Sequence, residues 1–294
     1  MKRKIPFVPA VFLALLLFAY IPGPPRVSAD MGPKPSVTVS IQGLEGRTCY
    51  ATLLSQREST GPASAYDGEN ARYAQGDEGY EIWRAMADFQ DADGFYFLQE
   101  FWDCTGTDSF RWGYYPPSVF KILLYFPEED AFVVSGVCER YAFDSYFTME
   151  LNGEAAMGEP PLVEKSYDYT WEIVSLLVRI VLTIFLELLV ALLFGWREKR
   201  QLLLLAGVNT ATQVILNILL NLVNYGQGWM MFLFCYVLLE LVVFAVEEVV
   251  FSAFLPRVSR GPVKKGKAMW YAFAANALSF LAGLGLAKAL PGIF

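Results

Sequence analysis

Residues 229–255 read WMMFLFCYVLLELVVFAVEEVVFSAFL, an almost wholly apolar run. An α-helix rises roughly 1.5 Å per residue and the hydrocarbon core of a bilayer is roughly 30 Å thick, so about 20 apolar residues span it. The run is therefore long enough to cross a membrane. It also carries Glu240, Glu247 and Glu248. An ionisable side chain at that depth costs about 2.5 kcal/mol or more unless it finds a partner, a proton or a water-filled cavity.

Apolar segments of similar length lie on both sides of this run and predict a bundle of four transmembrane helices. The segments cover residues 173–194, 202–223, 230–255 and 268–290. Residues 196–200 and 257–267 are rich in Arg and Lys, whereas residues 224–229 carry no charge. Because cytoplasmic connections carry an excess of Lys and Arg, the first and third connections are predicted inside the cell and the second outside. The prediction is a multi-pass protein of the cell membrane, with its N-terminal domain and its C-terminus outside.

The first 29 residues have the pattern of a secretory signal peptide. Three basic residues at positions 2–4 precede an apolar stretch at residues 7–20, and Val27-Ser28-Ala29 provides a small-residue ending. We favour cleavage after Ala29, and an uncleaved anchor is the alternative. Either outcome exports the chain that follows.

The distribution of charge divides the rest of the chain into two parts. Residues 30–168 hold 24 Asp and Glu against 9 Lys and Arg, whereas residues 169–294 hold 6 against 10. We therefore expect an exported acidic domain at residues 30–168 and a membrane domain at residues 169–294. An acidic domain neutralises few phosphates, so nucleic acid is not expected as a partner. The expected partners are membrane lipid and either another membrane protein or an extracytoplasmic ligand.

The chain contains no histidine and four cysteines, which limits its chemistry. Histidine is the commonest general base and a principal metal ligand, and no C-x-x-C motif is present, so we expect no enzyme, no metal and no cofactor. Cys49, Cys104 and Cys138 lie in the acidic domain, where export permits one disulfide. We predict the pair Cys49 and Cys104, because the start of one antiparallel strand can lie beside the end of another. Cys138 instead falls within a strand.

Alternating apolar and polar residues predict a small β-sandwich in the acidic domain. The expected strands cover residues 37–41, 48–54, 95–104, 118–126, 131–143 and 145–151, and one short helix covers residues 82–89. The chain as a whole is thus predicted to have a mixed fold, with a β-rich exported domain followed by an all-α transmembrane domain.

Two features of the acidic domain are candidates for binding. Residues 89–100 place acidic side chains at positions of a calcium loop, but phenylalanine occupies the first position, so a hairpin turn at Asp93 is favoured. Trp112, Tyr114 and Tyr115 are the candidates for an exposed patch, because the adjacent residues 114–117, Tyr-Tyr-Pro-Pro, cannot all face inward. An exposed aromatic patch there could bind glycan, peptide or a partner protein. Packing against the domain's own loop is the favoured alternative.

Seven polar side chains lie at similar depth in the four apolar segments. They are Glu187, Asn209, Gln213, Glu240, Glu247, Asn276 and Ser279. Within a segment they share a helical face, since Asn209 and Gln213 are four residues apart and Glu240 and Glu247 seven. Arg179 lies nearer the outer end of its segment and is not counted with them. The seven either hold the bundle together, at roughly 0.6 kcal/mol per hydrogen bond, or form a proton or ion relay or a polar cavity for a small ligand.

Two resemblances bear on function. Glu247-Glu248 resembles the opening of the E-E-x-x-x-R motif of intramembrane CAAX-protease-like proteins, but Ser252 stands at the arginine position and the later histidine motifs have no counterpart. Intramembrane proteolysis is therefore not expected. The stretches at residues 30–36 and 164–172, with nearly the whole chain, resemble uncharacterised bacterial multipass membrane proteins that have a signal peptide and an exported N-terminal domain. This second resemblance implies a location and no activity.

The two functional hypotheses differ in which domain acts. Residues 165–171 form a very short linker, and Tyr167, Tyr169 and Trp171 fit an interfacial aromatic belt. A domain held this closely is positioned rather than merely displayed, so the leading hypothesis is a sensor or accessory subunit whose exported domain binds a ligand or partner. The alternative is a small transporter or a proton- or ion-conducting protein that uses the buried glutamate and asparagine layer.

Overall fold

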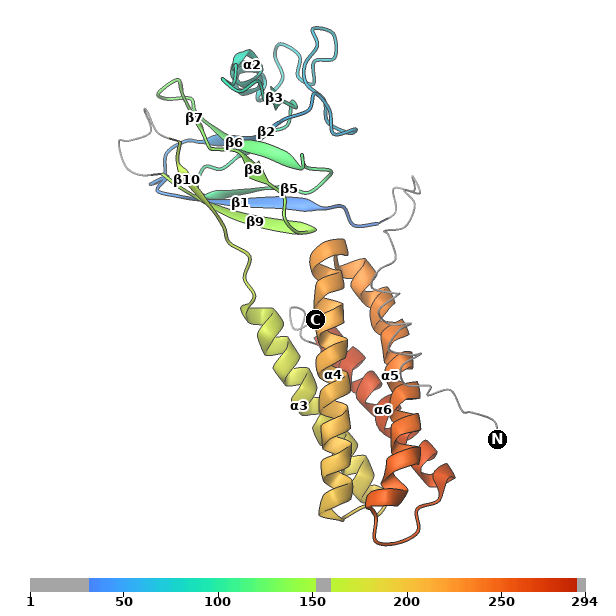
Figure 1. Cartoon of the computed structure of the whole chain (residues 1–294). Helices are drawn as coiled ribbons and strands as arrows, with labels where there is room; N and C mark the ends of the chain where they lie inside the picture. Colours follow the sequence, from blue (N-terminus) through green and yellow to red (C-terminus); the bar gives the residue numbers. More distant parts are fainter. Residues whose placement is uncertain (1–31, 152–159, 290–294) are drawn as a thin grey trace. The chain divides into compact units, whose positions relative to one another are not determined.

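A computed structural model describes residues 32–151 and 160–289 (Figure 1). The described chain forms two compact units, one at residues 33–167 and one from residue 168 onward. The expected signal peptide at residues 1–29 lies outside the described residues.

The first unit is β-rich, with two sheets and one helix. Its strands are β1 (Ser36–Gln42), β2 (Tyr50–Ser55), β3 (Tyr96–Phe97), β4 (Trp102–Asp103), β5 (Ser109–Trp112), β6 (Val119–Phe126), β7 (Ala131–Val134), β8 (Cys138–Glu139), β9 (Asp144–Glu150) and β10 (Leu162–Lys165), and its helix is α2 (Tyr80–Asp88). One sheet has the order β10-β9-β1-β5. The other has the order β3-β2-β6-β7, with β4 also pairing with β2 and β8 with β6.

The core of this unit lies between the two sheets. Val37, Val39 and Ile41 of β1 alternate with other residues and are buried, as their spacing predicts. They belong to one apolar cluster with residues of β2 and β6 from the other sheet. β6 is buried on both faces, because α2 covers the outer face of its sheet with Trp83 and Met86 (Figure 1).

The single strand expected at residues 95–104 is wrong, since the structure has β3 and β4 there, separated by Gln99. Gln99 has a left-handed backbone with a φ of 63°, which an extended strand does not allow. Its buried side-chain amide accepts the N–H of Arg72 at 2.9 Å and donates to the carbonyls of Ser64 and Asn70 at 3.1 and 3.2 Å. The break in the strand therefore anchors the long loop that precedes α2.

The sheet that contains β1 brings distant parts of the chain together. β1 runs parallel to β9 and antiparallel to β5, so Val39 lies between Phe147 and Phe110. The sequence prediction misses β5 and β10, the two edge strands of this sheet, and takes β7 and β8 as one strand at residues 131–143. β5 and β10 are four residues long, which leaves too little alternation to identify them.

The second unit is a helical bundle. Its helices are α3 (Thr170–Leu193), α4 (Lys199–Gln227), α5 (Trp229–Val258) and α6 (Lys265–Ala289) (Figure 1). α4 contacts α3 and α5, and α6 contacts α5 and α3, which closes the bundle. Among the described residues, α3, α4 and α5 are long and apolar enough to cross a membrane. The expected fourth span is not matched, since α6 is not among these helices.

Hydrogen bonds join two connections at one end of the bundle. Glu198 caps α4 in a capping box with Gln201. The Glu198 carboxylate also accepts the backbone N–H of Arg260 at 3.0 Å, and the Gln201 amide donates to the Ser259 hydroxyl at 2.7 Å. The two basic connections therefore lie side by side.

Candidate functional site

Glu247 on α5 joins three helices. Its side chain is inaccessible to solvent, and both of its carboxyl oxygens accept hydrogen bonds. The Thr212 hydroxyl on α4 donates to one at 2.5 Å, and the Asn276 amide on α6 donates to the other at 2.7 Å. These bonds fit the interpretation that polar side chains hold the bundle together.

Glu187 on α3 has very different surroundings. Its side chain is also inaccessible to solvent, yet its Oε2 atom has no hydrogen-bond partner. Its Oε1 atom lies 3.5 Å from the Ser279 hydroxyl oxygen on α6, which is a long hydrogen bond. Asn276 and Ser279 are one turn apart on α6, so a single turn of this helix contacts both Glu247 and Glu187. A carboxyl group with so few hydrogen bonds is a candidate for binding a proton or a cation.

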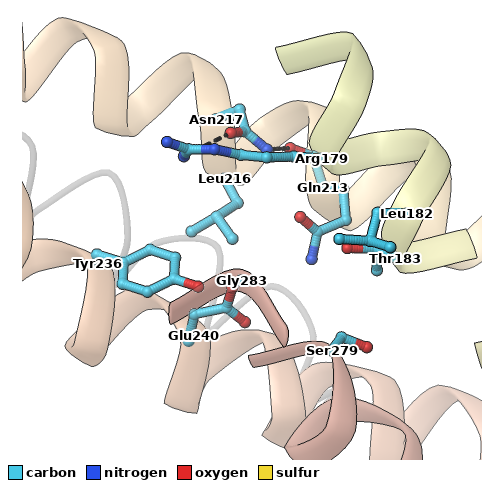
Figure 2. Close-up of a pocket in the computed structure, with 10 residues that line it drawn as sticks. All are labelled: Arg179, Leu182, Thr183, Gln213, Leu216, Asn217, Tyr236, Glu240, Ser279 and Gly283. Atoms are coloured by element: carbon cyan, nitrogen blue, oxygen red, sulfur yellow. Dashed lines mark hydrogen bonds between the residues drawn. The ribbon is translucent and has the colours of Figure 1, made fainter. Parts of the chain in front are cut away.

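Glu240 on α5 faces a small cavity that all four helices line (Figure 2). The cavity has a volume of about 20 Å³. Its polar lining consists of Arg179, Thr183, Gln213, Asn217, Tyr236, Glu240 and Ser279. A polar cavity of this size holds about one water molecule. We call this space and its lining the Glu240 cavity.

Arg179 on α3 supplies the positive charge of the Glu240 cavity. Its Nη1 donates to the amide oxygen of Asn217 on α4 at 3.1 Å, and Asn217 in turn donates to the Gln213 carbonyl at 2.8 Å (Figure 2). The guanidinium also lies over the ring of Phe232, 5.5 Å from its centroid. Sequence analysis misses this role, because depth along a helix does not reveal which side chains share a cavity. An arginine inside an apolar segment is nevertheless a signal in itself.

The spacing of residues on each helix brings the cavity lining to one face. Tyr236 and Glu240 on α5 are four residues apart, as are Ser279 and Gly283 on α6, so each pair lies on one side of its helix. A β carbon at Gly283 would lie 2.9 Å from the Tyr236 hydroxyl oxygen. Glycine at this position therefore permits the close approach of α5 and α6 beside the cavity.

The structure brings six of the seven predicted polar residues into two neighbouring groups. The cavity group is Gln213, Glu240 and Ser279, and the group around the turn of α6 is Glu187, Glu247 and Asn276. The seventh, Asn209, is inaccessible to solvent, and its amide nitrogen and oxygen lack hydrogen-bond partners in the described chain. Thr212 and Tyr236 belong to the site although the sequence did not single them out.

Acidic side chains outnumber basic ones in the buried interior of the described bundle. In residues 32–151 and 160–289, no three side chains of His, Cys, Asp or Glu are grouped so that they could hold a metal ion. The charged side chains buried in the described part of the bundle are Arg179, Glu187, Glu240 and Glu247. One guanidinium offsets one carboxylate, so protons or singly charged cations are the species that could offset the others.

The three predicted members of an aromatic patch are not all exposed. Trp112 is 2% exposed, its indole N–H donates to the Tyr114 carbonyl at 3.0 Å, and its ring centroid lies 5.2 Å from that of Trp102. Its assignment to an exposed patch is therefore wrong, because the alternation of β5 turns it into the core. Tyr114 and Tyr115 are exposed by 44% and 38%, with ring centroids 5.0 Å apart.

Cys49 and Cys104 lie next to each other and are free thiols in the structure. β2 and β4 pair so that Tyr50 lies opposite Asp103, and the next pair along the ladder is Cys49 and Cys104. The N–H of Cys104 donates to the carbonyl of Cys49 at 2.8 Å. Burial raises the pKa of each thiol to about 12. The register is compatible with the predicted disulfide, which stays a prediction.

Two aspartates of the turn at residues 91–94 form ion pairs with a lysine of β6. Lys121 Nζ on β6 lies 2.8 Å from Asp91 Oδ1 and 2.6 Å from Asp93 Oδ2. Burial favours a raised pKa for Asp91, but hydrogen bonds from Lys121 and from the N–H groups of Phe95 and Asp93 outweigh it and hold the pKa below its usual value. The turn connects α2 to β3, so the expected β-hairpin is wrong.

Comparison of the chain with protein-family models, with curated proteins and with solved structures gives no match. The resemblance to uncharacterised bacterial membrane proteins stays an expectation. The chemistry of the buried carboxyl groups is therefore the basis for assigning a function.

Proposed function

We propose that this chain is an integral membrane protein whose helical unit takes up and releases a proton or another small cation at its buried carboxyl groups. The main support for this proposal is the environment of Glu187. It is inaccessible to solvent, its Oε2 has no hydrogen-bond partner, and its Oε1 has a single long contact with the Ser279 hydroxyl in the described chain. A carboxyl group that is useful only as a hydrogen-bond acceptor would be better bonded, as Glu247 is.

The energetics of burial support the same conclusion. An ionised carboxyl group inside a membrane helix costs about 2.5 kcal/mol or more, and glutamine could supply a similar hydrogen-bonding shape without the charge. Glu187, Glu240 and Glu247 are nevertheless all buried in the bundle, where one turn of α6 contacts Glu187 and Glu247 and Arg179 lines the same cavity as Glu240. Three carboxyl groups whose burial costs this much free energy are expected in a site that uses their negative charge.

The proposal includes a topology. We propose that the signal peptide exports the β-rich unit, that α6 completes a fourth crossing, and that the C-terminus is outside. The basic connections at residues 196–200 and 257–267 then lie in the cytoplasm, as the positive-inside rule requires. The hydrogen bonds of Glu198 and Gln201 support this arrangement, because they place both connections at one end of the bundle.

A second candidate function is that of a sensor or accessory subunit, in which the β-rich unit binds a ligand or a partner protein. The exposed pair Tyr114 and Tyr115 favours it, since adjacent exposed tyrosines are typical of binding surfaces. Photo-crosslinking from position 114 in cells tests it. A specific crosslinked product that Tyr115→Ala abolishes would support this function, and crosslinks equal to those from the exposed Tyr66 would count against it.

The purified full chain in liposomes tests the leading proposal. Flux of protons, sodium and potassium is measured separately and compared with that of empty liposomes. A chain with Glu187, Glu240 and Glu247 all changed to glutamine serves as the matched control. We expect flux of at least one cation with the wild-type chain and none with the control. Wild-type flux equal to that of empty liposomes for all three would contradict the proposal.

A further inference from the structure

Ser279 connects the Glu240 cavity to Glu187. It lines the cavity, and its hydroxyl oxygen lies 3.5 Å from Glu187 Oε1 and 2.8 Å from the carbonyl oxygen of Ala275. A hydroxyl group has one hydrogen and two lone pairs, so Ser279 can donate to either oxygen while it accepts from a third group. These are the contacts that a proton-relay group requires.

The Glu240 cavity has room for one bridging water. Its volume of about 20 Å³ exceeds the roughly 10–15 Å³ that one water needs. Gln213, Tyr236, Glu240 and Ser279 all line it, and a buried water needs two to four such polar partners. In Figure 2, Glu240 and Ser279 come from neighbouring helices on the same side of this space.

We infer that the exchanged species is a proton, and that it passes between Glu240 and Glu187 through one cavity water and the Ser279 hydroxyl. This inference rests on the proposed function. The O–H bond of the Glu240 carboxylic acid breaks and its proton passes to the water, which gives a proton to the Ser279 oxygen. Ser279 releases its own proton to Glu187 Oε1. One proton moves in total, Glu240 becomes a carboxylate, Glu187 becomes a neutral acid, and water and serine are regenerated.

Arg179 favours a proton over a metal cation on this path. Arg179 lines the same cavity as Glu240, so its positive charge would repel a metal ion there but stabilise the Glu240 carboxylate that proton release leaves behind. A cavity of about 20 Å³ also has no room for a hydrated metal ion.

Each helix contributes differently to the electrostatics of the path. α3 supplies Arg179, and α5 supplies Tyr236 and Glu247 beside Glu240. α6 supplies Tyr271, whose hydroxyl donates to the Glu187 carbonyl at 3.3 Å. α4 supplies neutral amides, of which Asn217 contacts Arg179.

Infrared difference spectroscopy of the full chain in lipid, recorded through a pH titration, tests the relay together with proton flux. Glu187→Gln and Glu240→Gln assign the carboxylic-acid bands. For Ser279→Ala we expect the Glu187 band to shift and proton flux to fall about tenfold or more. Ser279→Thr keeps the hydroxyl and should retain both properties, and Ser279→Cys, a weak donor, should be intermediate. The matched control is Ser252→Ala, which removes an exposed hydroxyl bonded to the Val249 carbonyl at 3.1 Å.

The outcomes separate the relay from the proposed function. Proton flux in Ser279→Ala and Ser279→Cys equal to that of the wild type would overturn the relay and leave the proposed function intact. Flux of sodium or potassium without proton flux would do the same. No flux of any of the three cations would overturn both. A loss of flux in Ser279→Ala that Ser279→Thr restores would support the relay.

Discussion

Lys121 is a residue of the β-rich unit whose replacement we expect to be costly. Lys121→Met preserves much of the side-chain volume but leaves Asp91, whose side chain is 3% exposed, without its cation. Removing one partner of a buried ion pair costs about 3–5 kcal/mol. Hydrogen exchange at the β6 amides of the full chain should accelerate accordingly. The control is Arg84→Met, which removes an exposed pair with Asp88 worth about 0.5 kcal/mol, and equal effects of the two substitutions would contradict this account.

The same ion pair predicts how stability depends on pH. Because the pKa of Asp91 is lowered, its carboxylate stabilises the fold above its unfolded pKa of about 3.9, and that contribution is lost as the pH falls through the folded pKa. Burial opposes the charge on Lys121, but its bonds to Asp91 and Asp93 raise its pKa, so its contribution is lost only as the pH rises through that raised value. The difference in stability between wild type and Lys121→Met should therefore shrink below about pH 4. A difference that is constant down to about pH 2 would argue against the pair.

For single residues, sequence periodicity predicts the depth of a side chain along its helix better than it predicts which side chains that residue contacts. It places Glu240 and Glu247 on α5 at depths that agree with those of Asn276 and Ser279 on α6, and the structure brings these residues close together. It does not predict that Arg179 shares a cavity with Glu240. That contact depends on the rotation of α3 about its own axis, which side-chain packing between helices sets.

At the scale of elements, the pairing of β2 with β4 leads to a prediction for the cysteines. We expect a disulfide between Cys49 and Cys104 in protein isolated from an exporting cell, since the two residues are neighbours in the ladder. A bridge across a loop of this length stabilises a domain by about 4 kcal/mol. Because burial raises the pKa of both thiols, little thiolate forms in the folded domain, and we expect oxidation before the thiols are buried. Peptide mapping without reduction measures the pairing, and a link from Cys104 to Cys138 would refute it.

Strands and helices with a clear alternation or helical spacing of apolar residues could be predicted from the sequence. Elements whose ends are set by the hydrogen bonds of one side chain could not. β1 and α2 appear close to where alternation and helical spacing place them. The break between β3 and β4 depends on the three hydrogen bonds of the Gln99 amide to a distant loop. No local pattern contains that information, because the partners lie between 27 and 35 residues away.

At the scale of the whole molecule, the proposed topology predicts the accessibility of each connection. We expect Gly226→Cys to react with a membrane-impermeant maleimide on intact cells, above the background of the parent chain. Arg197→Cys and Gly261→Cys should react only after the membrane is opened, because basic connections are retained inside. All three positions are exposed in the structure, so lack of reaction is not a matter of burial. Labelling of Arg197→Cys on intact cells would contradict the topology.

On the proposed function, the buried carboxyl groups act on a cation and do not merely hold the bundle together. Proton flux into liposomes, measured across pH for Glu240→Gln beside the wild type, tests it most directly. Glu248→Gln is the matched control, since Glu248 is the neighbour of Glu247 and is only partly buried. We expect Glu240→Gln to fold and insert but to lose roughly a hundredfold in flux, while Glu248→Gln keeps wild-type flux. Wild-type flux in Glu240→Gln at every pH would show that this carboxyl group has only a structural role.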